Sequence, residues 1–144
     1  MSIWFGEPSI EWANSRGEHA LIRALGIEMT ELGDDVLRGR MPVDHRTRQP
    51  GGVLHGGASV AFAETLASWG SSFTVDPAEK YCVGMEINAN HIRPVAEGWV
   101  YGEARPIARG RTTHVWEVRI TDGDGRLVCI SRCTLAVLST PSQY

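Results

Sequence analysis

The chain has 144 residues, of which 42% are hydrophobic, and its 14 basic and 17 acidic side chains give a formal net charge of -3. This length and composition predict one folded domain over residues 1–144 and argue against intrinsic disorder. The slight negative charge disfavours a nucleic-acid partner bound by bulk charge, although a few local arginines could still bind a small phosphorylated ligand.

The chain shows no sign of a membrane segment or a secretory leader. No apolar run approaches roughly 18 residues, so we expect no membrane partner. The opening residues MSIWFGEPSIEW lack a basic start and a long apolar stretch. Cys82, Cys129 and Cys133 form no CxxC pair and are odd in number, which favours reduced thiols in a cytoplasmic protein.

Two short helices are predicted before the first strand, within residues 9–25. Pro8 and Ser9 can begin one helix, with the Ser9 side chain as its N-cap. A second helix is expected over residues 18–25, and Gly26 would end it.

Two short strands and a long loop are predicted next. The strands cover residues 27–32 and 36–43, and a turn at residues 33–35 joins them. Residues 46–57 are expected to form a loop, because Pro50 and two pairs of glycines interrupt any regular pattern.

One long helix is predicted over residues 57–73, in the middle of the chain. Its residues are Ala, Val, Phe, Leu and Trp with small Ser, Thr and Gly, and its one charged residue is Glu64. This composition is typical of a helix without a solvated face, buried inside a protein.

After this helix the hydrophobic pattern changes to a period of two, which is typical of strands. Four strands are predicted, over residues 82–93, 99–108, 112–121 and 126–138. Short connections join them, so we expect an antiparallel meander over residues 82–138. A curved antiparallel sheet wrapped around the one long central helix would bury that helix, and the sequence therefore predicts an α+β fold.

Glu64 is the first candidate catalytic residue, because a buried carboxylate is costly unless something uses or pairs it. A carboxylate in such surroundings suits a general base or a nucleophile. Ser68 lies four residues further on and shares a helix face with Glu64. The alternatives are a partly exposed or structurally paired Glu64, and a Ser68 hydroxyl that bonds back to the helix backbone.

The start of the central helix is a second candidate site. Gly56 and Gly57 let the backbone approach a ligand closely, and the first N–H groups of a helix lack partners within it. These groups can form an oxyanion hole at the positive end of the helix, the alternative being a plain transition from loop to helix. A metal site is not expected, since no ligand-like spacing is found among His45, His55, His91 and His114.

Several motifs together resemble one protein family. They include LGDDVL, LHGGAS, AET, NANHIRPV and the GR ahead of WE, and they extend over residues 27–138. The chain resembles the hotdog-fold acyl-CoA thioesterases, in the PaaI-like and 4-hydroxybenzoyl-CoA thioesterase branch with a catalytic glutamate on the helix. It is most similar to the small enterobacterial members that act on aryl thioesters. The resemblance implies a hotdog fold and the hydrolysis of acyl-CoA thioesters, with an aryl or small acyl group, to the free acid and CoA.

The resemblance assigns catalytic roles to five residues. Glu64 either activates the hydrolytic water or attacks the thioester carbon, and Ser68 helps to hold the carboxylate or the water. The Gly56 N–H group binds the thioester carbonyl, His55 orients the thioester, and Gln49 contacts the carbonyl or the water. Without the resemblance, His55 is equally a structural histidine and Gln49 a solvated loop residue.

Further residues are implied in binding the substrate. Trp69 would restrict the acyl pocket to a flat or small group, unless it belongs to the core, and His91 would line that pocket or serve packing. Val83 and Gly84 would let the pantetheine arm pass close to a strand. Cations at the mouth of the channel would bind the CoA phosphates, unless they are simply solvated, and these are Arg93, Arg109 and Arg111.

The distance along the central helix implies a second chain. Gly56 and Glu64 lie roughly 12 Å apart along a helix, whereas groups that act on one carbonyl must be within about 3–4 Å of each other. We therefore expect a two-fold symmetric homodimer in which Glu64 and Ser68 of one chain meet Gln49, His55 and Gly56 of the other. The resemblance implies that such dimers pair into a homotetramer.

Two other functions remain open from the sequence. One is a hotdog hydratase or dehydratase that acts on acyl thioesters, and the spacing of the five catalytic candidates favours the hydrolase over it. The other is a non-catalytic acyl-CoA-binding protein, which the single carboxylate of the helix disfavours. No cofactor is expected beyond the CoA of the substrate. The acyl group is not determined, nor is the carrier, which is CoA or an acyl-carrier protein.

Overall fold

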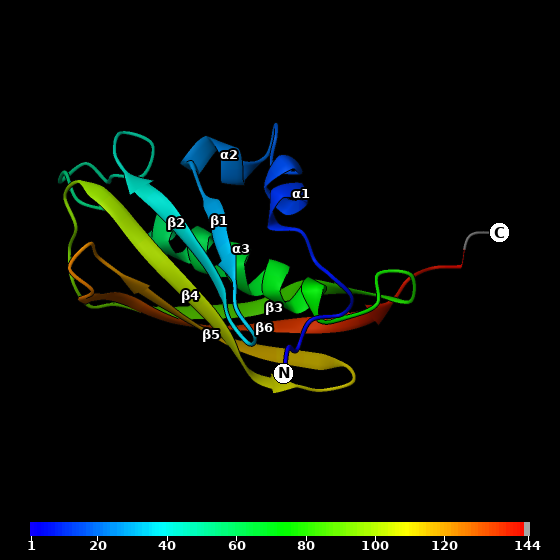
Figure 1. Cartoon of the computed structure of the whole chain (residues 1–144). Helices are drawn as coiled ribbons and strands as arrows, with labels where there is room; N and C mark the ends of the chain where they lie inside the picture. The colour runs from blue at the N-terminus through cyan, green and yellow to red at the C-terminus, as the bar shows by residue number, and fades with distance from the viewer. Residues whose placement is uncertain (143–144) are drawn as a thin grey trace.

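The long helix α3 (Gly56–Phe73) lies in the concave side of a curved, six-stranded antiparallel sheet (Figure 1). The computed structural model describes residues 1–142, so residues 143 and 144 of the predicted domain lie outside the described residues. The predicted α+β fold, with a curved sheet around one central helix, is confirmed. Among residues 1–142, none of the helices has the length and hydrophobicity that crossing a bilayer requires.

The sheet has the spatial order β1-β2-β4-β5-β6-β3, and every neighbouring pair is antiparallel. The strands are β1 (Glu28–Leu32), β2 (Leu37–Val43), β3 (Lys80–His91), β4 (Gly98–Arg109), β5 (Thr113–Thr121) and β6 (Leu127–Ser139). Each predicted strand is present, and the ends differ by no more than two residues.

One part of the predicted meander over residues 82–138 is wrong. β4, β5 and β6 do run as a meander, but β3 pairs with β6 and lies at the edge of the sheet. The connection from β3 to β4 is held at the start of β6 by the Ile92 N–H group, which donates to the Val128 carbonyl at 2.8 Å. Because the sheet is strongly curved, this short connection joins two strands that are not neighbours.

The two N-terminal helices have the cap residues that the sequence predicted, Ser9 before the first and Gly26 after the second. α1 (Ile10–Ser15) begins after Ser9, whose Oγ atom accepts from the Trp12 N–H group at 3.1 Å. α2 (Leu21–Leu25) starts three residues later than predicted and ends at Gly26, where φ is +72°. Both helices lie beside α3, so the N-terminal segment borders the central helix (Figure 1).

Two facing glycines create the space into which α3 packs. Gly39 of β2 and Gly102 of β4 are register partners. A Cβ atom at Gly102 would lie 2.6 Å from the Leu66 side chain, and one at Gly39 would lie 2.9 Å from it. Leu66 and Phe62 are fully buried at this point, so the helix approaches the sheet closely because these strand positions lack side chains.

One stripe of α3 stays partly exposed, so the predicted absence of a solvated face is wrong. The sheet covers the opposite side of the helix only, and β3 beside the stripe is an open edge with exposed apolar side chains. The residues of the stripe are Val60, Ala61, Glu64, Thr65, Ser68 and Trp69.

Candidate active site

The structure divides the predicted site residues between two hollows. One, the helix-start pocket, is a cavity of about 300 Å³ whose lining includes Gln49, Gly56, Ser59, His91 and Arg93. The other, the helix-flank groove, has about 480 Å³, and its lining includes Leu21, Ile22, Glu64, Ser68 and Trp69. Gly56 and Glu64, which were predicted to act on one carbonyl from two different chains, therefore line different hollows of a single chain.

The position where α3 begins is set by backbone bonds of the preceding loop. The His55 N–H group donates to the Thr47 carbonyl, and the Leu54 N–H group donates to the Val95 carbonyl, each at 2.8 Å. Thr47 is 1% exposed, and its hydroxyl donates to the Pro42 carbonyl at the end of β2. These bonds attach the start of the helix to β2, through Thr47, and to the connection between β3 and β4, through Val95.

His55 is the N-cap of α3. Its Nδ1 atom accepts from the Gly57 N–H group at 2.8 Å, and the ring is exposed. In a neutral imidazole whose Nδ1 atom accepts, the proton is on Nε2, so His55 presents an N–H donor to the surroundings of the helix start.

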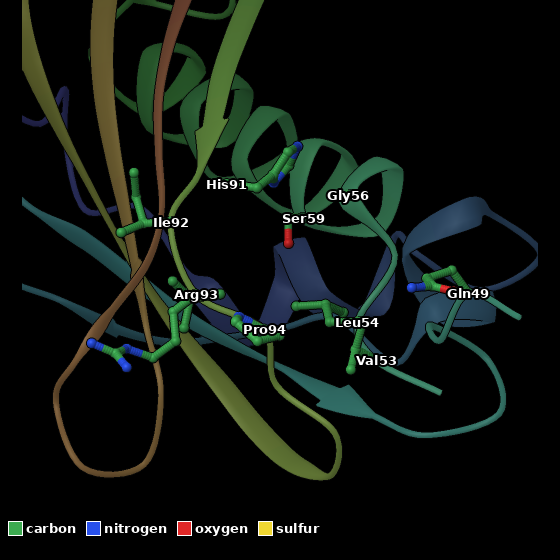
Figure 2. A pocket seen from close by; sticks show the side chains of 10 residues that line it. Gln49, Val53, Leu54, Gly56, Ser59, His91, Ile92, Arg93 and Pro94 are labelled. Atoms are coloured by element: carbon green, nitrogen blue, oxygen red, sulfur yellow. The ribbon is translucent and has the colours of Figure 1, made fainter. Parts of the chain in front are cut away.

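Gly56 provides a free backbone donor beside His91. Within residues 1–142 its N–H group has no hydrogen-bond acceptor. A Cβ atom at this position would lie 2.8 Å from the His91 Nε2 atom, so a side chain here would displace the imidazole. Figure 2 shows the His91 ring against the first turn of α3, with the hydroxyl of Ser59 directed into the same pocket.

Gln49 and Arg93 line the helix-start pocket but point elsewhere. The Gln49 Oε1 atom accepts from the Gly51 N–H group, so this side chain turns back onto its own loop. Figure 2 shows the guanidinium of Arg93 directed away from the start of the helix. In the single chain neither side chain meets Gly56.

Glu64 points towards the edge strand. A Cβ atom at Gly84 of β3 would lie 2.5 Å from the Glu64 Oε1 atom, so the carboxylate lies against a strand position that must lack a side chain. β3 and β6 shift register between Gly84 and Glu86, which places a β-bulge beside the carboxylate. No hydrogen bond or ion pair within residues 1–142 engages Glu64, so its oxygens are open to a ligand or water.

The Cys133 thiol, which feels the charge of Glu64, is not a competing nucleophile. Burial raises the pKa of Cys133 to about 12, and the charges of Glu64 and Glu86 contribute to this rise. A thiol with such a pKa stays protonated at neutral pH, and the thiol form is not nucleophilic.

Ser68 and Trp69 continue the groove beyond Glu64. The hydroxyl of Thr65 bonds back to the Ala61 carbonyl at 2.7 Å, whereas the Ser68 hydroxyl has no partner within residues 1–142. The Trp69 ring packs edge-on against Trp12, with 5.8 Å between centroids, and also lines the groove. Trp69 therefore belongs partly to the packing of α1 and partly to the wall of the groove.

Of the other proposed binding residues, Gly84 lies beside Glu64, and the arginines lie apart from it. Val83 and Gly84 are exposed on the edge strand β3. Arg109 ends β4 and Arg111 lies in the turn between β4 and β5, close to the N-terminus (Figure 1). A single chain does not bring these two arginines together with Arg93, which lies at the start of α3.

Three polar residues inside the protein were missed from the sequence. Ser71 of α3 and His114 of β5 are 0% and 4% exposed and share a hydrogen bond of 2.6 Å. The inward direction of His114 could have been predicted, because it alternates with Trp116 and Val118 along the strand. Ser59, 1% exposed, carried no such signal. Within residues 1–142 no group of three potential ligands could hold a metal ion.

Comparisons with known proteins agree with one another. The model of the thioesterase superfamily matches residues 51–129. A 1,4-dihydroxy-2-naphthoyl-CoA hydrolase of Escherichia coli is 44% identical over 136 residues, covering 94% of this chain and 99% of that protein. The crystal structure of a mutant thioesterase from Pseudomonas aeruginosa, with one glutamine replaced by alanine, superposes with a TM-score of 0.95 at 45% identity, covering 96% of this chain and 100% of that chain.

A more distant neighbour is known in two mutant forms. The Staphylococcus aureus protein is 36% identical and superposes with TM-scores of 0.80 and 0.78. The two structures cover 83% and 81% of this chain, and this chain spans 99% and 97% of theirs. One mutant replaces a glutamate by alanine, and the other replaces a glutamine that precedes this glutamate by 15 residues.

Proposed function

Since this chain belongs to the thioesterase superfamily, we propose that it hydrolyses acyl-CoA thioesters to the free acid and CoA, with Glu64 as the reacting carboxylate. The predicted hotdog fold and the predicted family are confirmed by the comparisons. The observation that carries the role of Glu64 is its position: it is the one acidic residue of α3, it lies in a groove, and no group within residues 1–142 pairs with it.

The spacing of two residues supports this assignment. Gln49 and Glu64 are 15 residues apart, the same interval as between the glutamine and the glutamate replaced in the Staphylococcus aureus thioesterase. Gln49 and Glu64 are therefore our candidates for the polar pair that handles the carbonyl and the attacking group.

Hydrolysis requires three groups around the thioester. The carboxylate of Glu64 either takes a proton from water as the water attacks the carbonyl carbon, or attacks that carbon itself. The Gly56 N–H group, at the positive end of α3, stabilises the oxyanion that forms. The His55 Nε2–H group is a second donor near this oxygen, and Ser68 orients the carboxylate or the water. Collapse of the tetrahedral species expels the CoA thiolate, which takes up the proton released by water. Where Glu64 itself attacked, the product of this step is an acyl-glutamate anhydride, which water then hydrolyses to the free acid and the Glu64 carboxylate.

Two chains are needed to assemble these groups. Gly56 and Glu64 lie roughly 12 Å apart along α3, too far to act on one carbonyl. In a homodimer whose α3 helices run antiparallel, the Gly56 of each chain comes beside the Glu64 of the other. Each of the two sites then takes Glu64 and Ser68 from one chain, and Gln49, His55 and Gly56 from its partner.

The open edge of the sheet supports such a dimer. β3 is a 12-residue edge strand that exposes Tyr81, Val83 and Met85 beside the groove. A long apolar edge of this kind is an aggregation hazard unless another strand covers it. Pairing with β3 of a second copy would cover it and place the two α3 helices side by side. We further propose that two such dimers form a homotetramer.

The antiparallel arrangement also accounts for the separated arginines. Arg93 lies at the start of α3, and the Arg109–Arg111 turn lies at its other end. In the dimer the Arg93 of one chain approaches the Arg109–Arg111 turn of the other. These cations would bind the phosphates of CoA, while Val83 and Gly84 flank the path of the pantetheine arm.

The acyl group enters the helix-flank groove. Trp69 supplies a flat apolar wall there, which suits an aryl or small acyl group, and the Escherichia coli relative is named for an aryl-CoA substrate. His91 contributes from the partner chain, beside Gly56. We propose a single catalytic domain without a cofactor, acting in the cytoplasm and without a nucleic-acid or membrane partner.

Release of thiol from benzoyl-CoA tests the reaction. A thioesterase liberates one free thiol per turnover, which a thiol reagent detects, with benzoate as the second product. A hydratase, dehydratase or acyl-CoA-binding protein leaves the thioester intact. Absence of thiol release across aryl, short-chain and long-chain acyl-CoA substrates, and acyl-carrier thioesters, would contradict the proposed function.

A further inference from the structure

A buried hydrogen bond joins the second half of α3 to β5. The Ser71 Oγ and His114 Nδ1 atoms are 2.6 Å apart, and both residues are buried. Burial lowers the pKa of the His114 imidazole, and the positive charges of Arg109 and Lys80 add to this effect. The ring is therefore neutral at pH 7, and its Nδ1 atom can accept the hydrogen bond from the Ser71 hydroxyl.

His114 is the first buried residue after an exposed turn. Every residue from 107 to 113 is exposed, and Arg109 is the strand partner of His114. The Gly110 N–H group closes the turn by donating to the Thr113 carbonyl at 2.8 Å. Among the side chains at this end of the hairpin, that of His114 is thus the one that reaches the interior.

The same turn carries two cations without acidic partners. Four of the five other strand arginines form ion pairs within residues 1–142, among them Arg105 with Asp35 and Arg119 with Glu117, and Arg132 is the exception. Within residues 1–142, neither Arg109 nor Arg111 has an ion-pair partner. Guanidinium groups that no carboxylate occupies are suited to bind phosphate oxygens.

We infer that the hydrogen bond between Ser71 and His114 holds the Arg109–Arg111 turn where it can bind the phosphates of the CoA leaving group. His114 is then a positioning residue, since it touches neither the thioester nor CoA. This inference rests on the proposed function and extends it to a residue inside the protein. It predicts that loss of the bond weakens the binding of substrates that carry phosphates and leaves the binding of phosphate-free substrates unchanged.

Two substrates with the same acyl group separate these effects. Benzoyl-CoA carries the nucleotide phosphates, whereas the benzoyl thioester of N-acetylcysteamine ends before them. In His114→Leu the KM for benzoyl-CoA should rise by about 10-fold, the value of one charge-assisted contact, with kcat changed less than about two-fold. The kcat/KM for the truncated thioester should stay within about two-fold of the wild type.

Matched variants distinguish positioning from general damage. Ser71→Ala removes only the hydroxyl and should raise the same KM, whereas in His114→Asn the amide oxygen can accept in place of Nδ1 and should restore it. Arg119→Ala, which removes an exposed arginine of β5, should leave the KM for benzoyl-CoA and the kcat/KM for the truncated thioester unchanged. In the Arg109→Ala/Arg111→Ala background, His114→Leu should have no further effect on KM, because the two changes act through one contact.

Each outcome decides the inference. An equal loss on both thioesters, or additive effects in the arginine-free background, would mean that His114 serves stability alone. The inference also fails if the wild type has the same KM for both substrates, although the chain would still be a thioesterase. If the wild type hydrolyses neither thioester nor any other acyl-CoA, the proposed function itself fails. Melting temperatures of all variants show whether each one is folded.

Discussion

The two ends of α3 are built in opposite ways. At the start of the helix, the Gly56 N–H group has no acceptor within residues 1–142, and the flank carries an unpaired Glu64. In the second half, Ser71 is bonded to His114, and Gly70 is packed so closely that a Cβ atom would lie 2.8 Å from the Trp116 ring. Gly56 and Glu64 are partly exposed, so water or a ligand can reach their unpaired groups, whereas Ser71 and His114 are buried and satisfy each other. We call the part of the helix with the proposed reacting groups the reacting half, and the part around Ser71 the anchoring half.

The anchoring half has one exception to this contrast. The Trp116 Nε1 atom is buried without a hydrogen-bond partner within residues 1–142. Its ring stacks on Trp4, with 6.3 Å between centroids, so the indole is held by packing. The open N–H group does not face either of the hollows that hold the site residues.

The largest effect is expected from the unpaired carboxylate of the reacting half. Glu64→Gln keeps the size of the side chain and removes its basicity, so kcat should fall by roughly 10²–10⁴-fold while KM changes little. The fold should survive, because a neutral amide costs less to bury than a carboxylate. Glu79→Gln, an exposed glutamate outside the site, is the control and should match the wild type. A folded Glu64→Gln protein with normal kcat would end the proposed mechanism.

Mixed dimers test whether the reacting half is shared between chains. Glu64→Ala and His55→Ala should each be nearly inactive alone. After unfolding and refolding of an equimolar mixture, about half of the dimers are mixed, and each of these has one intact site. Activity should therefore recover to roughly a quarter of the wild type. If mass spectrometry shows mixed dimers but activity does not return, each site is built within one chain.

A substitution on the edge strand β3 should displace the Glu64 carboxylate while leaving Glu64 itself unchanged. In Gly84→Ala the new Cβ atom would lie 2.5 Å from the Glu64 Oε1 atom, so the carboxylate must move. We expect kcat to fall by about 10-fold, since displacement of a reacting group by an ångström or so costs on this order or more. Gly123→Ala, where a Cβ atom meets nothing within 4 Å, is the control. Unchanged kcat in Gly84→Ala would mean that Glu64 needs no fixed position.

The smallest effect is expected in the anchoring half, from pH. The pKa of His114 is lowered below its ordinary value of 6.5, chiefly by burial and then by the charges of Arg109 and Lys80. The unfolded chain therefore takes up a proton at this residue before the folded chain does as pH falls. The contribution of His114 to the free energy of unfolding is complete above about pH 6.5. It declines at lower pH until His114 is also protonated in the folded state.

Urea unfolding at pH 7.5 and 5.5 measures this decline. His114→Asn has no group that titrates there, so its free energy of unfolding should fall less between the two pH values than that of the wild type. An identical decline in wild type and His114→Asn would mean that His114 is not held neutral by the fold.

Local signals predicted most of the elements. The Ser9 cap, the Gly26 stop and the period-two pattern of the later strands each depend on residues that are neighbours in the chain, and all are present in the structure. The motif around His55, Gly56 and Glu64 also lies within one stretch, so the sequence alone is enough to name the candidate catalytic residues. These features need no knowledge of what packs against them.

Partners distant in the chain were decided by the tertiary structure alone. The length of the connection after β3 favoured pairing with β4, but the curvature of the sheet places β3 beside β6. Composition predicted that α3 has no solvated face, and the sheet leaves one stripe of it open. The bond between Ser71 and His114 joins residues 43 positions apart. The sequence by itself determined which segments are helix or strand and which residues are candidates for the chemistry, because these depend on local propensity and motif. Which edge stays open and which polar groups find partners depends on how a curved sheet closes around a helix, and only the folded chain specifies that.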